Sequence, residues 1–346
     1  MRRHIARPSS RARQRGAAIL LAMLTVVLVA TLASAALWQQ WRAVEVETAE
    51  RARAQSTWVL SGALDWARLI LSEDGRKGGT DHLSEPWAMP LEQARLSTFL
   101  AADRSDSLAA DASANAFLSG QINDLQARLN LRNLVQDDGK VHPPTLRMWE
   151  RLFAQLGLAP KQLDTLVAQV TRAQRAGTAA LAANQALDAN MDGPLWPQEP
   201  EQLAWLGLDA STLARLQPYI AVLPERTPVN LNTASATVLA ACLEGLRPSD
   251  AQRLLQARRL RPWENLDDVK TAARLPLLSL DTQQLGLSTR FFALQGALQI
   301  EGRTVQEYSV VQRDGTKVKT LWRKRPLPVA GPMESVTPTP TMPTDF

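Results

Sequence analysis

The side chains that most often catalyse reactions or bind metals are few in this sequence and lie far apart. It has one cysteine, Cys242, and three histidines, His4, His82 and His142. A single cysteine excludes an internal disulfide bond and a zinc site built from cysteines. The sequence also lacks HExxH, GxSxG and phosphate-loop motifs. Nothing in it indicates an enzyme, and its helical apolar context predicts that Cys242 is a small buried apolar side chain.

The N-terminus combines a basic leader with an uncharged apolar run. The first 16 residues contain six arginines and no acidic residue, and residues 17–37 follow without a charge. At about 1.5 Å per helical residue, this run spans the ~30 Å hydrocarbon core of a bilayer. Trp38 and Trp41 come directly after it, where aromatic residues favour the membrane–water interface. The run is therefore predicted to be a transmembrane helix.

The net charge of +5 belongs to this leader. Removing its six arginines from the 39 Lys and Arg leaves 33 against 34 Asp and Glu, so residues 17–346 carry −1. The basic excess is a topology signal rather than a sign of nucleic-acid binding. Because basic residues beside a span stay in the cytoplasm, we expect the rest of the chain on the other side of the membrane.

Three interpretations of this terminus remain open. The run is an uncleaved signal anchor, or it is a secretory signal peptide cut after Ala35. Residues 33–35, Ala-Ser-Ala, fit the small-x-small pattern of a signal-peptide cleavage site. The apolar run, however, exceeds the 7–15 residues usual for a signal peptide. In the third interpretation the chain is cut between Gly16 and Ala17. There the basic leader, the glycine and the intact apolar helix resemble a type IV prepilin signal, which a prepilin peptidase cuts and methylates.

This signal departs from the usual prepilin pattern at two positions. The pattern has Phe at +1 and Glu at +5, and this chain has Ala17 and Leu21. In pilins the Glu carboxylate offsets the N-terminal ammonium of the next subunit inside the apolar filament core, where an unpaired ammonium is costly. A subunit without it fits best at the end of a filament. The large minor pseudopilin K family of type II secretion systems characteristically lacks this Glu.

Two further stretches resemble the same family. Residues 124–134, Asp-Leu-Gln-Ala-Arg-Leu-Asn-Leu-Arg-Asn-Leu, are similar to its D-x-Q-G-R-x-N-L-N-x-L segment, with Ala127 in place of the usual glycine. Residues 216–224 are similar to its L-x-P-Y-x-x-x-L-P segment, and Thr-Pro-Val-Asn-Leu-Asn-Thr-Ala follows at 227–234. These stretches occur in the family's order, so the resemblance covers most of the chain.

Residues 227–269 also resemble a helix–hairpin–helix unit, in which Asn232 is predicted to cap the next helix. In DNA-binding units, a Gly-hydrophobic-Gly hairpin offers backbone N–H groups to a phosphate. Here the hairpin is Gly245-Leu246-Arg247-Pro248, and the Cβ of Arg247 hinders such an approach. The alternative function is a membrane-anchored DNA-binding protein that uses the neighbouring basic residues, which are Arg253, Arg258, Arg259 and Arg261.

Apolar periodicity predicts a long N-terminal helix. Apolar residues recur on one helical face at Leu60, Leu64, Ala67 and Leu71, with Trp58 and Ile70 close to it. We predict one helix over residues 17–71, which ends at the glycines between 75 and 79. The alternative is two helices broken near Gly62, but one glycine costs only about 1 kcal/mol within a helix.

The rest of the chain is predicted to contain strands on both sides of a helical block. Residues 116–124 are typical of a strand, and residues 291–301, 305–313 and 317–323 of three more. A short helix is predicted near residues 91–100. The region from 143 to 285 has helical spacing and is divided by prolines. Residues 326–346 contain six prolines and are predicted to be disordered.

The predicted fold class is α+β, with a long transmembrane helix packed on a small antiparallel sheet. This is a pseudopilin fold with a large inserted all-α domain that contains the helix–hairpin–helix-like unit. The predicted domains are a removed leader (1–16), the transmembrane part of the helix (17–37), the periplasmic helix and first part of the sheet (38–139), the inserted helical domain (140–285), the C-terminal strands (286–325) and the proline-rich tail (326–346).

The resemblance implies a structural subunit rather than an enzyme. It implies a minor pseudopilin at the tip of the type II secretion pseudopilus, which initiates assembly for export of folded proteins. The implied partners are the I-type and J-type minor pseudopilins, the prepilin peptidase and secreted proteins, and no nucleic acid is expected. The implied location is the inner membrane of a Gram-negative cell, as a single span with a cytoplasmic N-terminus and a periplasmic bulk.

The resemblance also implies a calcium site. In the family an Asp-rich loop binds calcium, a hard cation that takes six to eight oxygen ligands. This chain keeps Asp188 and Asp192 as candidate ligands, with Glu199 and Glu201 downstream, and the usual spacing is lost. An ordinary polar loop is the alternative.

Overall fold

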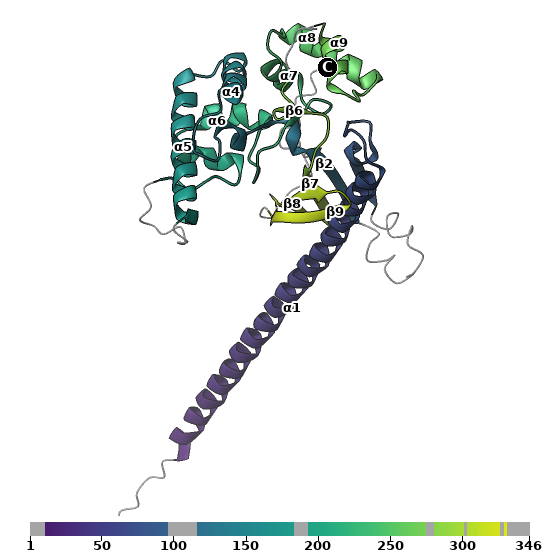
Figure 1. The fold of residues 1–346 in the computed structure, drawn as a ribbon. Helices are drawn as coiled ribbons and strands as arrows, with labels where there is room; N and C mark the ends of the chain where they lie inside the picture. Colours follow the sequence, from purple (N-terminus) through teal and green to yellow (C-terminus); the bar gives the residue numbers. More distant parts are fainter. Residues whose placement is uncertain are drawn as a thin grey trace, which may run out of the picture. The chain divides into compact units, whose positions relative to one another are not determined.

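The computed structural model describes residues 11–95, 116–182, 193–274, 280–300, 303–325 and 329–330 (Figure 1). The chain divides into two compact units, Met1–Val59 and Leu60–Phe346, and each is described by itself. Helix α1 (Arg11–Lys77) contributes residues to both units. The second unit contains a sheet and a group of further helices.

In the first unit, helix α1 presents apolar side chains on all sides. Ile19, Leu24, Leu28 and Leu32 are all exposed in the isolated chain. An apolar surface of this extent needs an apolar surrounding, which a bilayer supplies. Among the described helices, the part of α1 from Ala17 to Lys77 is the one that is long and apolar enough to span a membrane. The helix is therefore the candidate membrane anchor among the described residues.

Helix α1 is longer than predicted, and it continues through Gly62 without a break. It ends at Lys77 because Gly78 and Gly79 have φ angles of 68° and 109°, a region that favours glycine. The amide of Gly78 donates to the carbonyl of Asp74 at 3.1 Å and closes the last turn. The predicted continuous helix is confirmed, and Trp58, which lies close to the apolar face in the sequence pattern, is 79% exposed.

The six-stranded antiparallel sheet lies in the second unit, with strand order β1-β2-β7-β8-β10 and β9 also paired with β8. Its strands are β1 (Leu91–Arg95), β2 (Ala116–Asp124), β7 (Phe291–Ile300), β8 (Arg303–Asp314), β9 (Lys317–Lys324) and β10 (Val329–Ala330). The strands predicted at 116–124, 291–301, 305–313 and 317–323 are confirmed. The predicted disorder of residues 326–346 is wrong for Val329 and Ala330, which pair with Thr304 and Arg303.

The short helix predicted near residues 91–100 is wrong over its described part. Leu91–Arg95 forms strand β1, in which Arg95 pairs with Phe117 of β2. Without β1, strand β2 would have an unpaired edge, and the backbone hydrogen bonds gained there outweigh a weak helical pattern. Residues 96–100 lie outside the described residues.

The C-terminal part of α1 covers one face of the sheet (Figure 1). Leu64 and Leu71, four and eleven residues after Leu60, face the same side, as the apolar spacing predicts. They form a core with Trp87 of the 3₁₀ helix η1 (Pro86–Ala88) and with the alternating residues Phe292, Leu294 and Val311. This packing fixes which face of the sheet is turned away from α1.

The helices between β2 and β7 form a second core. They are α4 (Pro143–Gln155), α5 (Pro160–Ala182), α6 (Ala210–Leu216), α7 (Ala236–Cys242), α8 (Pro248–Leu260) and α9 (Leu266–Ala273), with the 3₁₀ helices η2 (Leu125–Ala127), η3 (Leu131–Leu134), η4 (Pro200–Leu206) and η5 (Gln217–Tyr219). Prolines begin α4, α5 and α8, where a missing N–H costs nothing. Cys242 is buried among apolar residues, as predicted, and burial raises the pKa of its thiol to about 12.

Two short parallel bridges lie between β2 and β7, outside the six-stranded sheet. They are β3 (Leu129–Asn130) with β4 (Ile220–Ala221), and β5 (Val229–Asn230) with β6 (Leu285–Gly286). The segments that they join are more than fifty residues apart in the sequence. The predicted α+β class is confirmed, because a long helix, an antiparallel sheet and a helical group are all present.

Candidate functional site

The residues of the predicted processing site all lie in helix α1. Gly16 and Ala17 are within its first two turns, and Leu21 follows one turn later. Leu21 is 65% exposed in the isolated chain, at the position where a pilin has its glutamate. Cleavage between Gly16 and Ala17 stays a prediction.

The predicted calcium ligands Asp188 and Asp192 lie outside the described residues. Their downstream neighbours are described and are engaged elsewhere. Glu199 accepts a hydrogen bond from Lys324 at 2.7 Å, and Glu201 accepts one from Gln217 at 2.7 Å. Calcium binding at Asp188 and Asp192 therefore stays a prediction.

Two of the stretches that resemble the secretion family meet in a buried polar network. Asp124, at the end of β2, accepts hydrogen bonds from the Thr233 hydroxyl at 2.6 Å and the Asn230 amide at 2.9 Å. It also accepts from the backbone N–H of Gln126 at 2.7 Å. All of these residues are buried. Because burial disfavours the charged form, it raises the pKa of Asp124 to about 6 despite these donors.

The same network continues along the chain to Asn130 and Asn133. The Asn133 side chain makes both hydrogen bonds to the backbone of Thr227, donating to its carbonyl at 2.7 Å and accepting from its N–H at 3.1 Å. The amide of Asn130 donates to the carbonyl of Glu225 at 2.8 Å. The polar side chains of 126–133 thus bond to backbone groups of residues 223–228. Together with the contacts of Asp124, they hold the helical group to the end of the sheet.

A second charged cluster fixes the end of helix α1. Arg313 of β8 forms ion pairs with Asp74 of α1 and with Asp81, and it donates to the Thr289 carbonyl at 2.9 Å. Its guanidinium lies 4.9 Å from the centre of the Phe292 ring. The sequence does not predict this cluster. Arg313 is more than two hundred residues from Asp74 and Asp81, and the three residues form no motif.

Glu85 completes a group of three carboxylates with Asp74 and Asp81, whose oxygen atoms lie within 4.8 Å of one another. Such a group has the hard oxygen donors that a divalent cation prefers. Arg313, however, already forms ion pairs with two of the three carboxylates. Burial, with the two nearby carboxylates adding to it, raises the pKa of Glu85 to about 7.

We expect Glu85→Gln to remove part of the pH dependence of stability. An acid whose pKa is higher in the folded state stabilises that state at low pH, and this contribution is lost as the pH rises from about 4.5 to 7. The substitution keeps an oxygen for the donors at 2.9 and 2.8 Å, which are the His82 N–H and the Trp87 indole. Thermal unfolding at pH 5 and pH 7.5 should therefore show a smaller decrease for Glu85→Gln than for the original chain.

The matched control is Glu150→Gln, which makes the same change on the exposed surface of α4. It should leave the decrease in Tm between pH 5 and pH 7.5 unaltered. An equal decrease in Glu85→Gln and the original chain would show that Glu85 has no raised pKa.

The helix–hairpin–helix-like unit is present as α7, the hairpin and α8, but its capping differs from the prediction. Ser235, not Asn232, caps α7 and accepts from the Val238 N–H at 3.2 Å. Asn232 instead bonds to the backbone of Trp263, at 2.9 and 3.0 Å. Its role is therefore to hold the segment before α9 against the start of the unit.

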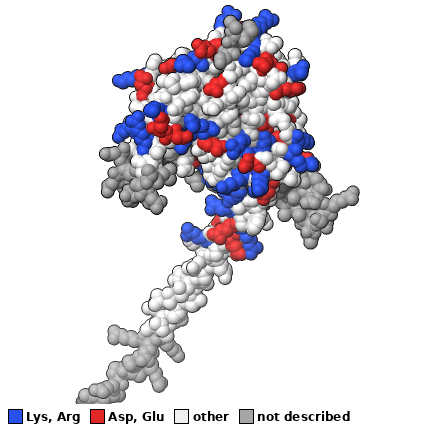
Figure 2. All heavy atoms as spheres, viewed as in Figure 1, with Lys and Arg blue, Asp and Glu red and all other residues white. Residues whose placement is uncertain are grey.

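Three arginines of this unit are engaged within the protein. Arg247 and Arg253 both pair with Asp250, at 3.0 and 2.9 Å. Arg258 is buried and donates to the Leu231 carbonyl at 2.6 Å. Figure 2 shows acidic and basic side chains interspersed on the visible face of the second unit, without a continuous basic stripe. This distribution disfavours binding to a phosphate backbone.

We therefore expect no band shift with duplex DNA, even at low salt, where phosphate contacts are strongest. The measurement is a gel shift with the detergent-solubilised full chain. A shift that weakens with added salt would support the DNA-binding alternative instead.

The architecture alone indicates a class of protein. An apolar N-terminal helix continues into a part that packs on an antiparallel sheet, which is the arrangement of a pseudopilin. The sheet is interrupted between β2 and β7 by the helical group, so this is a pseudopilin with a large insertion. The buried polar network is the joint between the two parts.

Comparisons with known proteins point to one family. The family described as "Type II secretion system (T2SS), protein K" matches residues 127–225 and 229–290. Type II secretion system protein K of Pseudomonas aeruginosa is 27% identical over 332 residues, covering 90% of this chain and 92% of that protein. The Klebsiella pneumoniae protein of the same name is also 27% identical, covering 87% and 96%.

A solved structure shares the fold. It is the crystal structure of the GspK-GspI-GspJ complex from enterotoxigenic Escherichia coli, with a TM-score of 0.60 and 19% identity, covering 80% of this chain and 98% of that one. These comparisons support the type II secretion system protein K family for this chain, and with it the class of minor pseudopilins of that system. The family resemblance and the predicted pseudopilin fold are both confirmed.

Proposed function

We propose that this protein is the tip subunit of the type II secretion pseudopilus and initiates its assembly. The observation that supports this most directly is the insertion between β2 and β7, which are neighbours in the sheet although residues 125–290 separate them. A subunit within a helical filament must accept another subunit above it. A bulky helical insertion obstructs such stacking, whereas at the tip it has free space.

Helix α1 supplies the second support for a position at the filament end. A carboxylate at position +5 offsets the terminal ammonium of a neighbour in a pilin, and this chain has Leu21 there. We propose that prepilin peptidase cuts after Gly16 and methylates Ala17, and that the N-terminus faces the cytoplasm while the bulk is periplasmic. The helix then leaves the inner membrane with the pseudopilus.

We propose that the I-type and J-type minor pseudopilins bind along helix α1. The Escherichia coli structure has GspI and GspJ in complex with GspK. In this chain the face of α1 opposite the sheet carries Trp66 and Leu69, which are 45% and 64% exposed and lie about one and two turns after Gly62. A Cβ at Gly62 would meet nothing within 4 Å, so another helix has room to approach closely there.

Leu69→Glu should lower the yield of I-type and J-type partners that co-purify with this chain by about tenfold. Burying one leucine at an interface contributes roughly 1.5–3 kcal/mol, and a buried glutamate adds a desolvation cost. The measurement is quantitative co-purification from membranes that contain all three proteins.

The matched control is Leu260→Glu on α8, where the side chain is 90% exposed and far along the chain from α1. It should leave the yield unchanged. Equal yields from Leu69→Glu and the original chain would contradict binding along this face of α1.

A further inference from the structure

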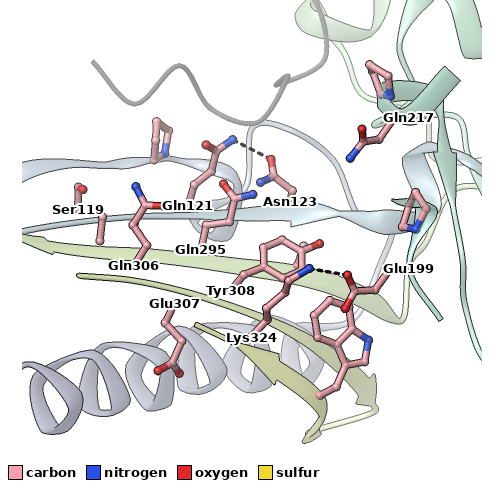
Figure 3. A pocket seen from close by; sticks show the side chains of 18 of the residues that line it. Ser119, Gln121, Asn123, Glu199, Gln217, Gln295, Gln306, Glu307, Tyr308 and Lys324 are labelled. Atoms are coloured by element: carbon pink, nitrogen blue, oxygen red, sulfur yellow. Dashed lines mark hydrogen bonds and ion pairs between the residues drawn. The ribbon is translucent and has the colours of Figure 1, made fainter. Parts of the chain in front are cut away.

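The face of the sheet that is turned away from α1 contains a cavity of about 490 Å³, which we call the outer-sheet cavity. Figure 3 shows Gln121, Gln295 and Gln306 on the strands that form its floor, with Glu199 and Gln217 across from them on the helical part. Its size is typical of a ligand site, and its walls combine apolar groups with a few polar ones.

One charged side chain of this cavity has a buried donor without an acceptor. Arg128 lines the cavity, and its Nε atom is enclosed without a hydrogen bond. Among the residues that the structure describes, it forms no ion pair. Burial lowers the pKa of Arg128, because a charged group loses hydration there. A guanidinium in this position is poised to bind a carboxylate in a bidentate manner.

The other charged side chains of the cavity have hydrogen-bond or ion-pair partners within the protein, and Glu307 pairs with Arg323 and Arg325. Lys324 pairs with Glu199 at 2.7 Å, and Gln217 donates to Glu201 at 2.7 Å. The aromatic rings of Tyr308 and Trp322 lie 5.3 Å apart on the same face. The cavity thus has an aromatic wall, a row of glutamine amides and one unpaired cation. Aromatic walls beside amide donors suit a proline-rich segment in the polyproline II conformation.

We propose that the outer-sheet cavity binds a proline-rich peptide segment through a carboxylate on Arg128, and that residues 331–346 of this chain supply that segment. Four prolines lie within it, and its charged residues are the two acids Glu334 and Asp345. The site is independent of the proposed tip function.

The geometry selects Asp345 over Glu334. The last described pair is Ala330 with Arg303, and Tyr308 at the cavity lies five residues further along β8. This is about 17 Å along a strand. Residues 331 and 332 are Gly-Pro, a pair typical of turns, which can direct the chain back over the sheet. At ~3.1 Å per residue, the segment needs about six residues after the turn, so Glu334 is too close and Asp345 is within reach.

The test uses the full chain in detergent and a chain that stops after Ala330, each titrated with a labelled peptide of residues 331–346. The shortened chain should bind the peptide with a Kd of about 0.1 mM or tighter, which is at least tenfold below the millimolar effective concentration of a tethered segment. The intact chain should bind it at least tenfold more weakly, since its own segment competes.

Two substitutions in the same assay identify the contact. The Asp345→Asn peptide should lose at least tenfold in affinity, and so should the shortened chain with Arg128→Gln. Arg147→Gln, on the exposed surface of α4, is the matched control and should bind normally. The peptide variant keeps the test decisive even if Arg128→Gln does not fold.

Three results would overturn the proposal. They are no binding at 5 mM peptide, equal binding by the intact and shortened chains, and equal binding by the original and Asp345→Asn peptides. If the shortened chain binds and the intact chain binds equally well, the cavity takes a carboxylate peptide from another protein instead.

Discussion

Replacing Arg313 by methionine should lower the free energy of unfolding by about 3–5 kcal/mol. The Arg313 side chain is 9% exposed and pairs with Asp74 and Asp81, which are 11% and 4% exposed. Removing the cation leaves two carboxylates in low dielectric without a counter-charge, which is the costly way to break a buried ion pair. The substitution also removes the donor to the Thr289 carbonyl.

The contacts of Arg313 join α1 and Asp81 to the end of β8 and to Thr289, just before β7. The loss of stability should therefore be global rather than local. The measurement is urea unfolding of the detergent-solubilised chain followed by fluorescence. Arg76→Met is the matched control, since it breaks the Arg76–Glu73 pair at the same end of α1. That pair is exposed and should contribute less than about 1 kcal/mol. Equal losses for the two variants would contradict a stabilising role for the Arg313 cluster.

Asp124→Leu should lower the free energy of unfolding by about 3 kcal/mol, which is the second largest effect that we expect. It removes the acceptor of three buried donors, which are the Thr233 hydroxyl, the Asn230 amide and the Gln126 N–H. Each buried donor without an acceptor costs roughly 1–3 kcal/mol, partly offset by the apolar area of leucine. Since this network holds the helical part to the sheet, hydrogen exchange in α7 should increase more than exchange in β8.

Asp164→Leu, an identical change at an exposed position of α5, is the control for this prediction. It should alter the unfolding free energy by less than about 0.5 kcal/mol. Asp124→Asn should fall between the two, because it retains one oxygen acceptor. A loss for Asp124→Leu no greater than that for Asp164→Leu would show that the network does not stabilise the joint.

The sequence predicted those elements whose pattern follows directly from burial on one face. Strand β7 alternates between Phe292 and Leu294, which face α1, and Phe291 and Ala293, which face away. Helix α1 repeats its buried leucines at helical spacing over its last third. In both cases, local periodicity and tertiary packing agree, so the prediction holds.

The remaining features depend on partners that are distant in the sequence. Strand β1 exists because β2 offers it an edge, and its own residues carry only weak strand preference. Asn232 is a residue type preferred at helix N-caps, but it bonds to the backbone of Trp263, thirty-one residues away. Arg313 lies in a strand and Arg128 follows a short 3₁₀ helix. The sequence around neither arginine predicts which side chains it contacts. Charged and polar contacts of this kind need the fold before they can be identified.

We propose that this pseudopilin is processed at its cytoplasmic end. The most direct test is the intact mass and N-terminal residue of the mature protein extracted from membranes. The proposed function predicts a chain that begins at Ala17 and carries one added methyl group. A chain that begins at Met1 or at Ala36 would contradict it, since the first is a plain signal anchor and the second a protein released from the membrane.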